Sequence, residues 1–96
     1  MIRTSPAAEA WAVLRSRPLS YTEGVRWQLA LHAARLAGQV PDVVLWLVHE
    51  PVITLGRRGR RTGLLRAPDE LRAMGVEVHV ASRGGDATYH GPGQWV

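Results

Sequence analysis

The apolar residues of this chain fall into short segments whose spacing changes along its length. Residues 11–14 form a brief apolar run that Arg17 and Pro18 close, which predicts a strand. Residues 43–49 are almost continuously apolar and rich in β-branched and aromatic side chains, which predicts a strand covered on both faces. A second short strand is expected at 52–55, just before a glycine.

Between the first two strands, apolar residues recur at helical spacing. Ser20 and Glu23 have the capping-box arrangement, in which each side chain satisfies the other residue's backbone N–H, so a helix should begin there. Gly38 stands where a helix C-terminal cap is expected. His32 lies near the apolar stripe and is interpreted as a structural histidine rather than a ligand. The predicted packing stripe consists of Val25, Leu29, Ala33 and Leu36.

The second half of the chain also predicts a helix followed by a strand. Pro68 introduces a short helix at 69–75, with acids in its first turn and a glycine at its end. Residues 76–80 alternate as a half-buried strand does, which puts Glu77 and His79 on one face and the valines on the other.

The order of elements predicts a mixed α/β or α+β fold without internal repeats or linkers. Trp95 and Val96 look like the start of a further strand. We therefore expect residues 1–96 to form the N-terminal part of a single domain that is incomplete at its C-terminus. The composition, with 46% hydrophobic and 21% charged residues, is that of a globular protein.

Composition also limits the chemistry. All 12 basic residues are arginines and cysteine is absent, which excludes a disulfide, a thiolate nucleophile and a thiolate metal site within these 96 residues. The N-terminus lacks the apolar run of a secretory signal, and the longest apolar stretch is too short to cross a bilayer. The expected location is the cytoplasm, with no membrane partner.

The densest charge lies in the glycine-containing segment 57–63. Its arginines could hold phosphate or carboxylate groups bidentately, or could form a solvated loop. Sequence-independent nucleic-acid binding would use a similar segment, although no aromatic residue lies within it to stack on a base.

The most informative motif is the polar, glycine-rich segment 83–94, which is expected to be a loop. It has neither the P-loop ending nor the Rossmann spacing of glycines. Its arginine, hydroxyl, imidazole and backbone N–H groups suit a carbonyl, a carboxylate or an oxyanion. His90 lacks a visible nucleophile or orienting acid, and nothing local activates Ser82 or Thr88 as a nucleophile.

This segment, Arg-Gly-Gly-Asp-Ala-Thr-Tyr-His-Gly-Pro-Gly-Gln, resembles the signature of the lipoyl(octanoyl) transferases, also called lipoate-protein ligase B. Residues 49–59 echo the same family pattern, and residues 19–21 do so more weakly. The resemblance runs over most of the chain but only over about the N-terminal half of the family's domain.

The resemblance implies a biotin/lipoate protein ligase-like catalytic domain, with a mixed sheet and flanking helices. It implies an enzyme that moves octanoyl, without cofactor or metal, from acyl-carrier protein to a lysine of lipoyl domains, those of 2-oxoacid dehydrogenases and of the glycine cleavage H protein. The basic segment 57–63 would then attract the acidic carrier protein. The substrate-binding residues implied are Arg83, Gly84, Gly85, Asp86, Ala87, Thr88, Tyr89 and His90.

The family's nucleophilic cysteine and the lysine that lowers its pKa have no counterpart here, so no catalytic residue is assigned and this chain alone is expected to be inactive. Three alternatives stay open. One is a non-catalytic or split fragment that needs a partner chain. Another is an ATP-dependent lipoate or biotin ligase relative, to which residues 56–60 bear a passing likeness. The third is a nucleic-acid-binding module.

Overall fold

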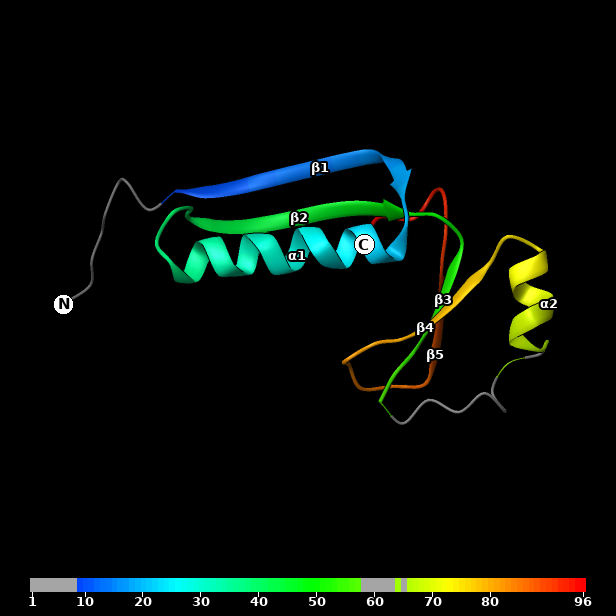
Figure 1. Ribbon diagram of the computed structural model, residues 1–96. Helices are drawn as coiled ribbons and strands as arrows, with labels where there is room; N and C mark the ends of the chain where they lie inside the picture. Colours follow the sequence, from blue (N-terminus) through cyan, green and yellow to red (C-terminus); the bar gives the residue numbers. More distant parts are fainter. Residues whose placement is uncertain (1–8, 58–63, 65) are drawn as a thin grey trace.

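The computed structural model describes residues 9–57, 64 and 66–96, and its elements confirm a mixed α/β fold. Two of the elements are helices, and strands precede, separate and follow them (Figure 1). In chain order they are β1 (Ala10–Leu19), α1 (Tyr21–Leu36), β2 (Asp42–His49), β3 (Val52–Leu55), α2 (Pro68–Ala73), β4 (Glu77–Val80) and β5 (Ala87–His90).

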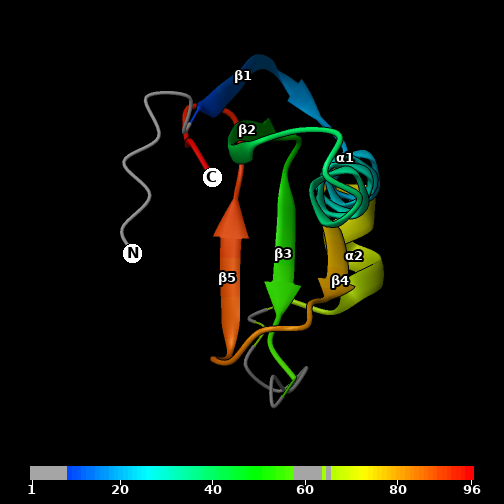
Figure 2. The same ribbon diagram turned by 90° about the vertical axis from the view of Figure 1, so that its left-hand side faces the viewer.

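The strands form two small sheets. β1 and β2 pair in parallel, with Trp11 opposite Val43 and Leu14 opposite Trp46. In the other sheet β3 lies in the centre, parallel to β4 and antiparallel to β5, as Figure 2 shows. The sheets lie beside one another in an elongated molecule of 53 × 28 × 20 Å, with a radius of gyration of 16.6 Å. A compact chain of this length would have about 12 to 13 Å, so much of each sheet remains accessible.

Strand β1 is longer than the apolar run predicted. It continues through Arg17 and Pro18 to Leu19, so the expectation that these two residues close the strand is wrong. Proline is tolerated at the edge of a sheet, where its missing N–H breaks no ladder. The pairing register with β2 shifts between Arg15 and Leu19, and Pro18 lies within that irregularity.

Helix α1 begins as the sequence predicts, at the Ser20 cap. The Ser20 hydroxyl accepts a hydrogen bond of 3.2 Å from the Glu23 N–H. The Glu23 carboxylate instead binds Arg26, at 2.6 Å from Nη1. Half of the predicted capping box is therefore formed. At the other end, Gly38 takes the left-handed conformation (φ 73°) just after the C-cap, as expected.

Replacing Ser20 with alanine is expected to lower the free energy of unfolding by about 1 kcal/mol, because the Glu23 N–H loses its acceptor. Urea denaturation followed by circular dichroism measures this change. The matched control is Thr22→Ala, which removes a hydroxyl from the exposed side of the same turn. Equal stability of the Ser20 variant and the wild type would show that the cap contributes nothing.

The predicted apolar stripe of α1 is not the face that packs. Leu29 is 63% exposed and Leu36 is 76% exposed, whereas the buried residue of the helix is Gly24. Gly24 faces Leu47 and His49 of β2, and its missing side chain lets the helix approach the strand closely. Because α1 contacts the sheet at Gly24, Leu29 and Leu36 do not face the sheet, contrary to the prediction from the apolar stripe.

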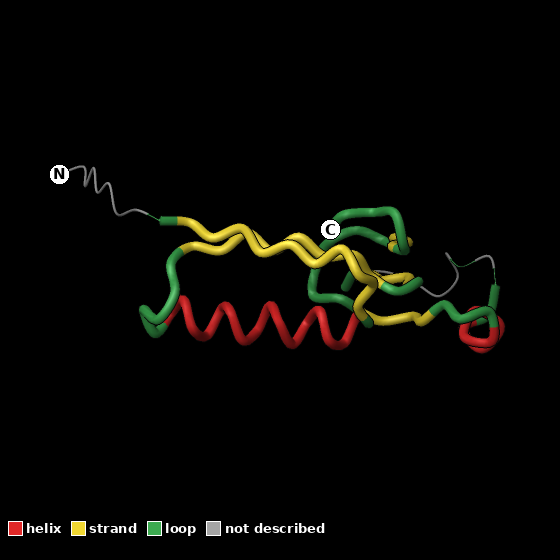
Figure 3. The backbone as a smooth tube through the Cα atoms, turned by 90° about the horizontal axis from the view of Figure 1, so that it is seen from above, coloured by secondary structure: helices red, strands yellow, loops and turns green. Residues whose placement is uncertain are grey.

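Strand β2 is not covered on both faces, contrary to the sequence prediction. Val44 is 52% exposed and Trp46 is 44% exposed, and only its last three residues are buried. Figure 3 shows α1 running along one side of the β1–β2 layer. Because side chains alternate along a strand, a helix on one side covers only every second residue.

Around β3, several sequence expectations hold. Pro68 is the first residue of α2, and Gly75 follows its end with φ 82°. Glu77 and His79 share a face of β4, since their side chains lie 2.7 Å apart. The opposite, valine face is less covered than expected, because Val80 is 72% exposed.

The segment 83–94 is not a loop throughout, so that prediction is wrong over residues 87–90. These four residues form β5 and pair with β3, Thr88 opposite Thr54. Beyond β5, Val96 exchanges two backbone hydrogen bonds with Leu47 of β2, at 2.9 and 2.8 Å, although residues 95 and 96 are not assigned to a strand. This reciprocal pair is the pattern of an antiparallel ladder.

The buried core lies where the two sheets approach each other and beneath α2. The buried apolar residues are Leu19, Leu47, Val48, Val52, Leu55 and Leu71, and His49 and Thr54 are the buried polar ones.

Among the described residues, neither helix is long and apolar enough to span a membrane.

Candidate functional site

The turn that precedes β5 is fastened to the end of β3. The Gly56 N–H donates to the Asp86 carbonyl at 2.8 Å, and the Arg57 N–H donates to the Arg83 carbonyl at 2.9 Å. A Cβ atom at Gly56 would collide with the backbone of Gly84 and Gly85. Glycine at position 56 therefore allows the Gly-Gly turn to lie directly on the strand.

Arg83 is directed into this junction. Its Nη2 donates to both the carbonyl and the hydroxyl oxygen of Thr54, each at 2.7 Å, and its Nη1 donates to the Gly84 carbonyl at 2.8 Å. The sequence predicted that this guanidinium would bind a carbonyl, a carboxylate or an oxyanion of a ligand. In the structure three hydrogen bonds of this group hold the turn in place, so the guanidinium acts first as a structural clamp.

The eight predicted binding residues do not share one surface. His90 and Arg83 line a cleft of about 300 Å³. Ala87 and Tyr89 lie instead along a mainly apolar groove of about 390 Å³, on the side of α2. Alternation along β5 explains this division. Gly84, Gly85, Asp86 and Thr88 are exposed.

The cleft also contains residues that the sequence did not predict as site residues. They come from the first half of α1, the end of β2, strand β3, the segment after β4 and the last residue of the chain. A signal was present for three of them, because His49 and Thr54 lie in the segment 49–59 and Tyr21 lies in the segment 19–21, both of which resemble the family pattern. The additional lining residues are Tyr21, Gln28, His49, Thr54, Ala81, Ser82 and Val96.

The imidazole rings of His49 and His90 and the phenol ring of Tyr21 line this cleft, and His79 lies next to Tyr21 outside it. The Tyr21 ring centroid lies 5.6 Å from that of His49 and 5.0 Å from that of His79. The His49 and His90 centroids are 6.0 Å apart. His49 is 2% exposed, and its Nδ1 makes no hydrogen bond to any described residue.

Burial lowers the pKa of His49 below 6.5, the proximity of His90 lowers it further, and the backbone of Leu19 acts in the opposite direction. The folded protein therefore resists protonation of this ring more than the unfolded chain does. At neutral pH the buried imidazole is uncharged, with one nitrogen as a donor and the other as an acceptor.

This pKa shift predicts that stability falls as the solution is acidified. Below a pH of about 6.5, His49 becomes protonated in the unfolded state while it stays neutral in the folded state, so acid favours unfolding. The free energy of unfolding keeps falling until the pH passes the lowered pKa of His49 in the folded state. Urea titrations between about pH 7.5 and about pH 5 measure the effect. His49→Gln should flatten the dependence and His32→Gln should leave it unchanged. An equal slope in the wild type and His49→Gln would refute this cause.

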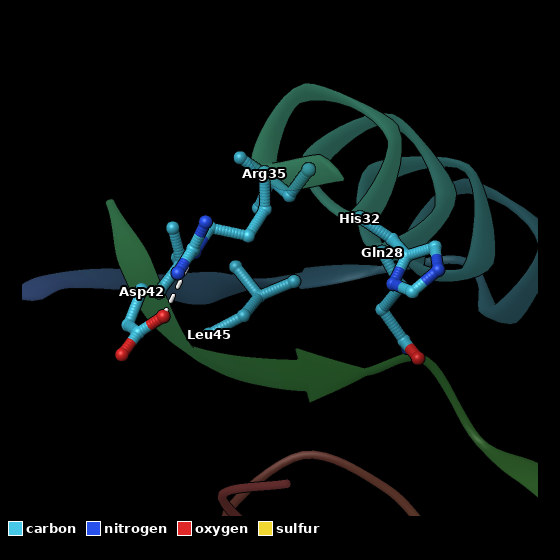
Figure 4. A pocket seen from close by; sticks show the side chains of 7 residues that line it. Gln28, His32, Arg35, Asp42 and Leu45 are labelled. Carbon is cyan, nitrogen blue, oxygen red and sulfur yellow. Dashed lines mark hydrogen bonds and ion pairs between the residues drawn. The ribbon is translucent and has the colours of Figure 1, made fainter. Parts of the chain in front are cut away.

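A separate hollow of about 410 Å³ lies between α1 and the first half of β2. Figure 4 shows Arg35 of α1 reaching Asp42 of β2, an ion pair of 2.8 Å, with Leu45 on the floor and Gln28 and His32 at the side. His32 is exposed rather than packed in a core, so its interpretation as a buried structural histidine is not supported.

Two other expectations concern charge and metal binding. Most of the basic segment 57–63, namely residues 58–63, lies outside the described residues. Within the residues that the structure describes, no cluster of three or more His, Asp or Glu side chains is arranged to hold a metal ion.

Comparison with known proteins shows the family to which this chain belongs. Residues 20–96 match the model of the lipoyl protein ligase A/B catalytic domain. The chain belongs to this family. The matched range begins at the Ser20 cap and includes both sheets except β1, so the biotin/lipoate ligase-like fold inferred from the motifs is confirmed.

Within the family, similar proteins bear the name octanoyltransferase. That of Syntrophobacter fumaroxidans is 50% identical over 78 residues, which cover 81% of this chain and 34% of the relative. That of Caldicellulosiruptor saccharolyticus is 46% identical over 78 residues, covering 81% and 33%. That of Rubrobacter xylanophilus is 48% identical over 77 residues, covering 79% and 35%. The chain spans about a third of the length of these curated relatives.

Proposed function

We propose that this chain is part of an octanoyltransferase of protein lipoylation and carries one wall of its acyl-substrate site. The observation behind this proposal is the identity of 46% to 50% with octanoyltransferases over a segment of 78 residues. The chain would be the N-terminal part of a single transferase domain that acts in the cytoplasm. Its donor would be octanoyl-acyl-carrier protein, and its acceptors would be lipoyl domains.

The proposed chemistry is acyl transfer through a thioester. A thiolate attacks the octanoyl thioester carbonyl, the carrier thiolate leaves, and the amine of the target lysine then displaces the enzyme thiolate. The 96 residues include no cysteine. We therefore assign residues 83–90 to substrate binding, and assign the nucleophile to no residue of this chain.

Two measurements on the chain test this proposal. Titration with octanoyl-pantetheine, a soluble stand-in for the loaded carrier protein, should shift the amide NMR signals of Arg83, Thr88 and His90. Incubation with octanoyl-acyl-carrier protein and a lipoyl domain should give no octanoylated product by mass spectrometry, since no thiolate is available. Absence of octanoyl-pantetheine binding would refute the substrate-site assignment, and robust turnover would refute the assignment of the nucleophile.

A second candidate is an ATP-dependent ligase, because the matched family model includes ligase A as well as ligase B. Such an enzyme activates its acid as an adenylate. No lysine is available in this chain to hold that adenylate, whereas the segment 89–93 favours the transferase. Transfer of label from α-labelled ATP to octanoate would favour the ligase, and the transferase proposal expects none.

The remaining alternative is that the chain is a split or non-catalytic fragment of such a transferase. In this case a partner polypeptide would supply the cysteine and the lysine. Mixing the chain with the complementary two thirds of a relative, such as the Syntrophobacter fumaroxidans octanoyltransferase, should restore octanoyl transfer. A non-catalytic remnant would give no transfer in the mixture.

A further inference from the structure

We propose that His49, seated against Gly24, is a positioning residue of the cleft and forms a hydrogen bond with an uncharged polar group of the acyl donor, its thioester carbonyl or an amide. The inference rests on the proposed function, because the donor is the ligand named there. His49 lies outside the eight residues that the sequence motif predicts for binding.

The first support is the unsatisfied nitrogen of a buried ring. His49 lines the cleft together with Arg83 and His90, yet only 2% of the residue is exposed. Its Nδ1 is enclosed and has no hydrogen-bond partner among the described residues. Buried polar atoms in folded proteins nearly always have a partner, and exceptions often mark the place of a water, an ion or a catalytic role. This nitrogen lies on the edge of the ring that faces Gly24, so a ligand or a ligand-held water in the cleft would satisfy it once the ring has turned.

The second support is the glycine behind the ring. A Cβ atom at Gly24 would lie 2.8 Å from His49 Cε1, 3.4 Å from Nδ1 and 3.3 Å from Leu47 Cδ1. Glycine inside a helix is less favourable than alanine, so its presence in the first turns of α1 calls for a packing reason. Here the missing side chain leaves room for the edge of the imidazole against the helix. Any larger residue at position 24 would displace the ring from this position.

The third support is the charge of the surroundings. The groups that face His49 are Tyr21 from α1 and His90 from β5, and Arg83 lines the same cleft. Burial and His90 lower the pKa of His49, so the ring is neutral at physiological pH. A neutral imidazole offers one donor and one acceptor, which matches a carbonyl or amide better than a carboxylate.

The test uses the whole chain and two probes, octanoyl-pantetheine and octanoate, with nitrogen-15 NMR of the histidine rings. Octanoyl-pantetheine should shift the ring nitrogens of His49 and leave those of His32 unchanged. His49→Phe should weaken its binding about tenfold, the equivalent of one hydrogen bond. His49→Gln should recover part of this loss, because an amide keeps a donor and an acceptor. Octanoate should bind the wild type more weakly than the thioester does.

Gly24→Ala separates positioning from folding. The added methyl group should displace the ring and weaken octanoyl-pantetheine binding by a similar factor, with a lower melting temperature. In a His49→Ala background the added methyl group meets only Leu47 Cδ1, at 3.3 Å, so the melting temperature should fall much less than in the wild type while binding stays weak. His32→Phe is the matched control and should bind as the wild type does.

Three outcomes would overturn the inference. If the wild type binds octanoyl-pantetheine and both His49→Phe and Gly24→Ala bind it equally well, His49 has no role and the proposed function stands. If the His49 ring nitrogens do not respond to bound octanoyl-pantetheine, the hydrogen bond is absent. If the wild type shows no binding, the inference and the substrate-site assignment fail together.

Discussion

Replacing Gly56 with alanine is expected to destabilise the fold by about 3 kcal/mol, the upper end of the cost of overpacking a well-packed site. The added Cβ would meet the carbonyl oxygen and carbon of Gly85 and the carbonyl oxygen of Gly84. These are backbone atoms and cannot swing aside as the end of a side chain can. The turn would have to leave β3, which would break the hydrogen bond from Gly56 to Asp86.

Thermal unfolding measures this effect, because a loss of that size lowers the melting temperature of a small domain by more than about 10 °C. The matched control is Gly84→Ala, in the same junction. A Cβ at Gly84 would have no atom within 4 Å, and its φ is not among the positive ones. The control should therefore melt within about 2 °C of the wild type. If the two variants melt at the same temperature, the close approach of the turn to β3 does not limit stability.

The local signals in the sequence predicted the ends of elements better than their packing. Ser20, Gly38 and Pro68 lie where the helices begin and end, because capping depends on a few neighbouring atoms. The packing face of α1 was predicted wrongly, since Leu29 is exposed and Gly24 is buried. A hydrophobic stripe indicates which face prefers burial, but close contact at a glycine depends on the strand it meets.

The candidate site was only partly accessible from the sequence. The motif 83–94 indicated a binding segment, yet it could not show that residues 87–90 would pair with β3. That pairing sends Tyr89 and His90 to opposite sides of the sheet. It also brings His90 to the ring of His49, 41 residues earlier in the chain, a contact that depends on tertiary structure rather than on any local pattern.

Replacing Arg83 with lysine is expected to lower the free energy of unfolding by about 2 kcal/mol, although the positive charge is kept. Arginine reaches the Thr54 carbonyl, the Thr54 hydroxyl and the Gly84 carbonyl at once, with bonds of 2.7, 2.7 and 2.8 Å. A lysine ammonium is a single point on a flexible stem and cannot reproduce this fork. Hydrogen bonds to a charged group contribute about 1.5 to 3 kcal/mol each. Losing one or more of these three bonds should therefore lower the free energy of unfolding measurably.

Urea denaturation of four proteins tests whether Arg83 acts as this clamp: wild type, Arg83→Lys, Thr54→Val and the double variant. Thr54→Val removes the hydroxyl acceptor and keeps the carbonyl, so it should lower the free energy of unfolding by less than Arg83→Lys does. The decrease in the double variant should be smaller than the sum of the two single decreases, because both substitutions break the same hydrogen bond. The matched control is Arg26→Lys, because Arg26 forms an exposed ion pair with Glu23 and its replacement should change stability by less than about 0.5 kcal/mol. If Arg83→Lys is as stable as Arg26→Lys, the guanidinium does not hold the turn, and its role would have to lie with the ligand.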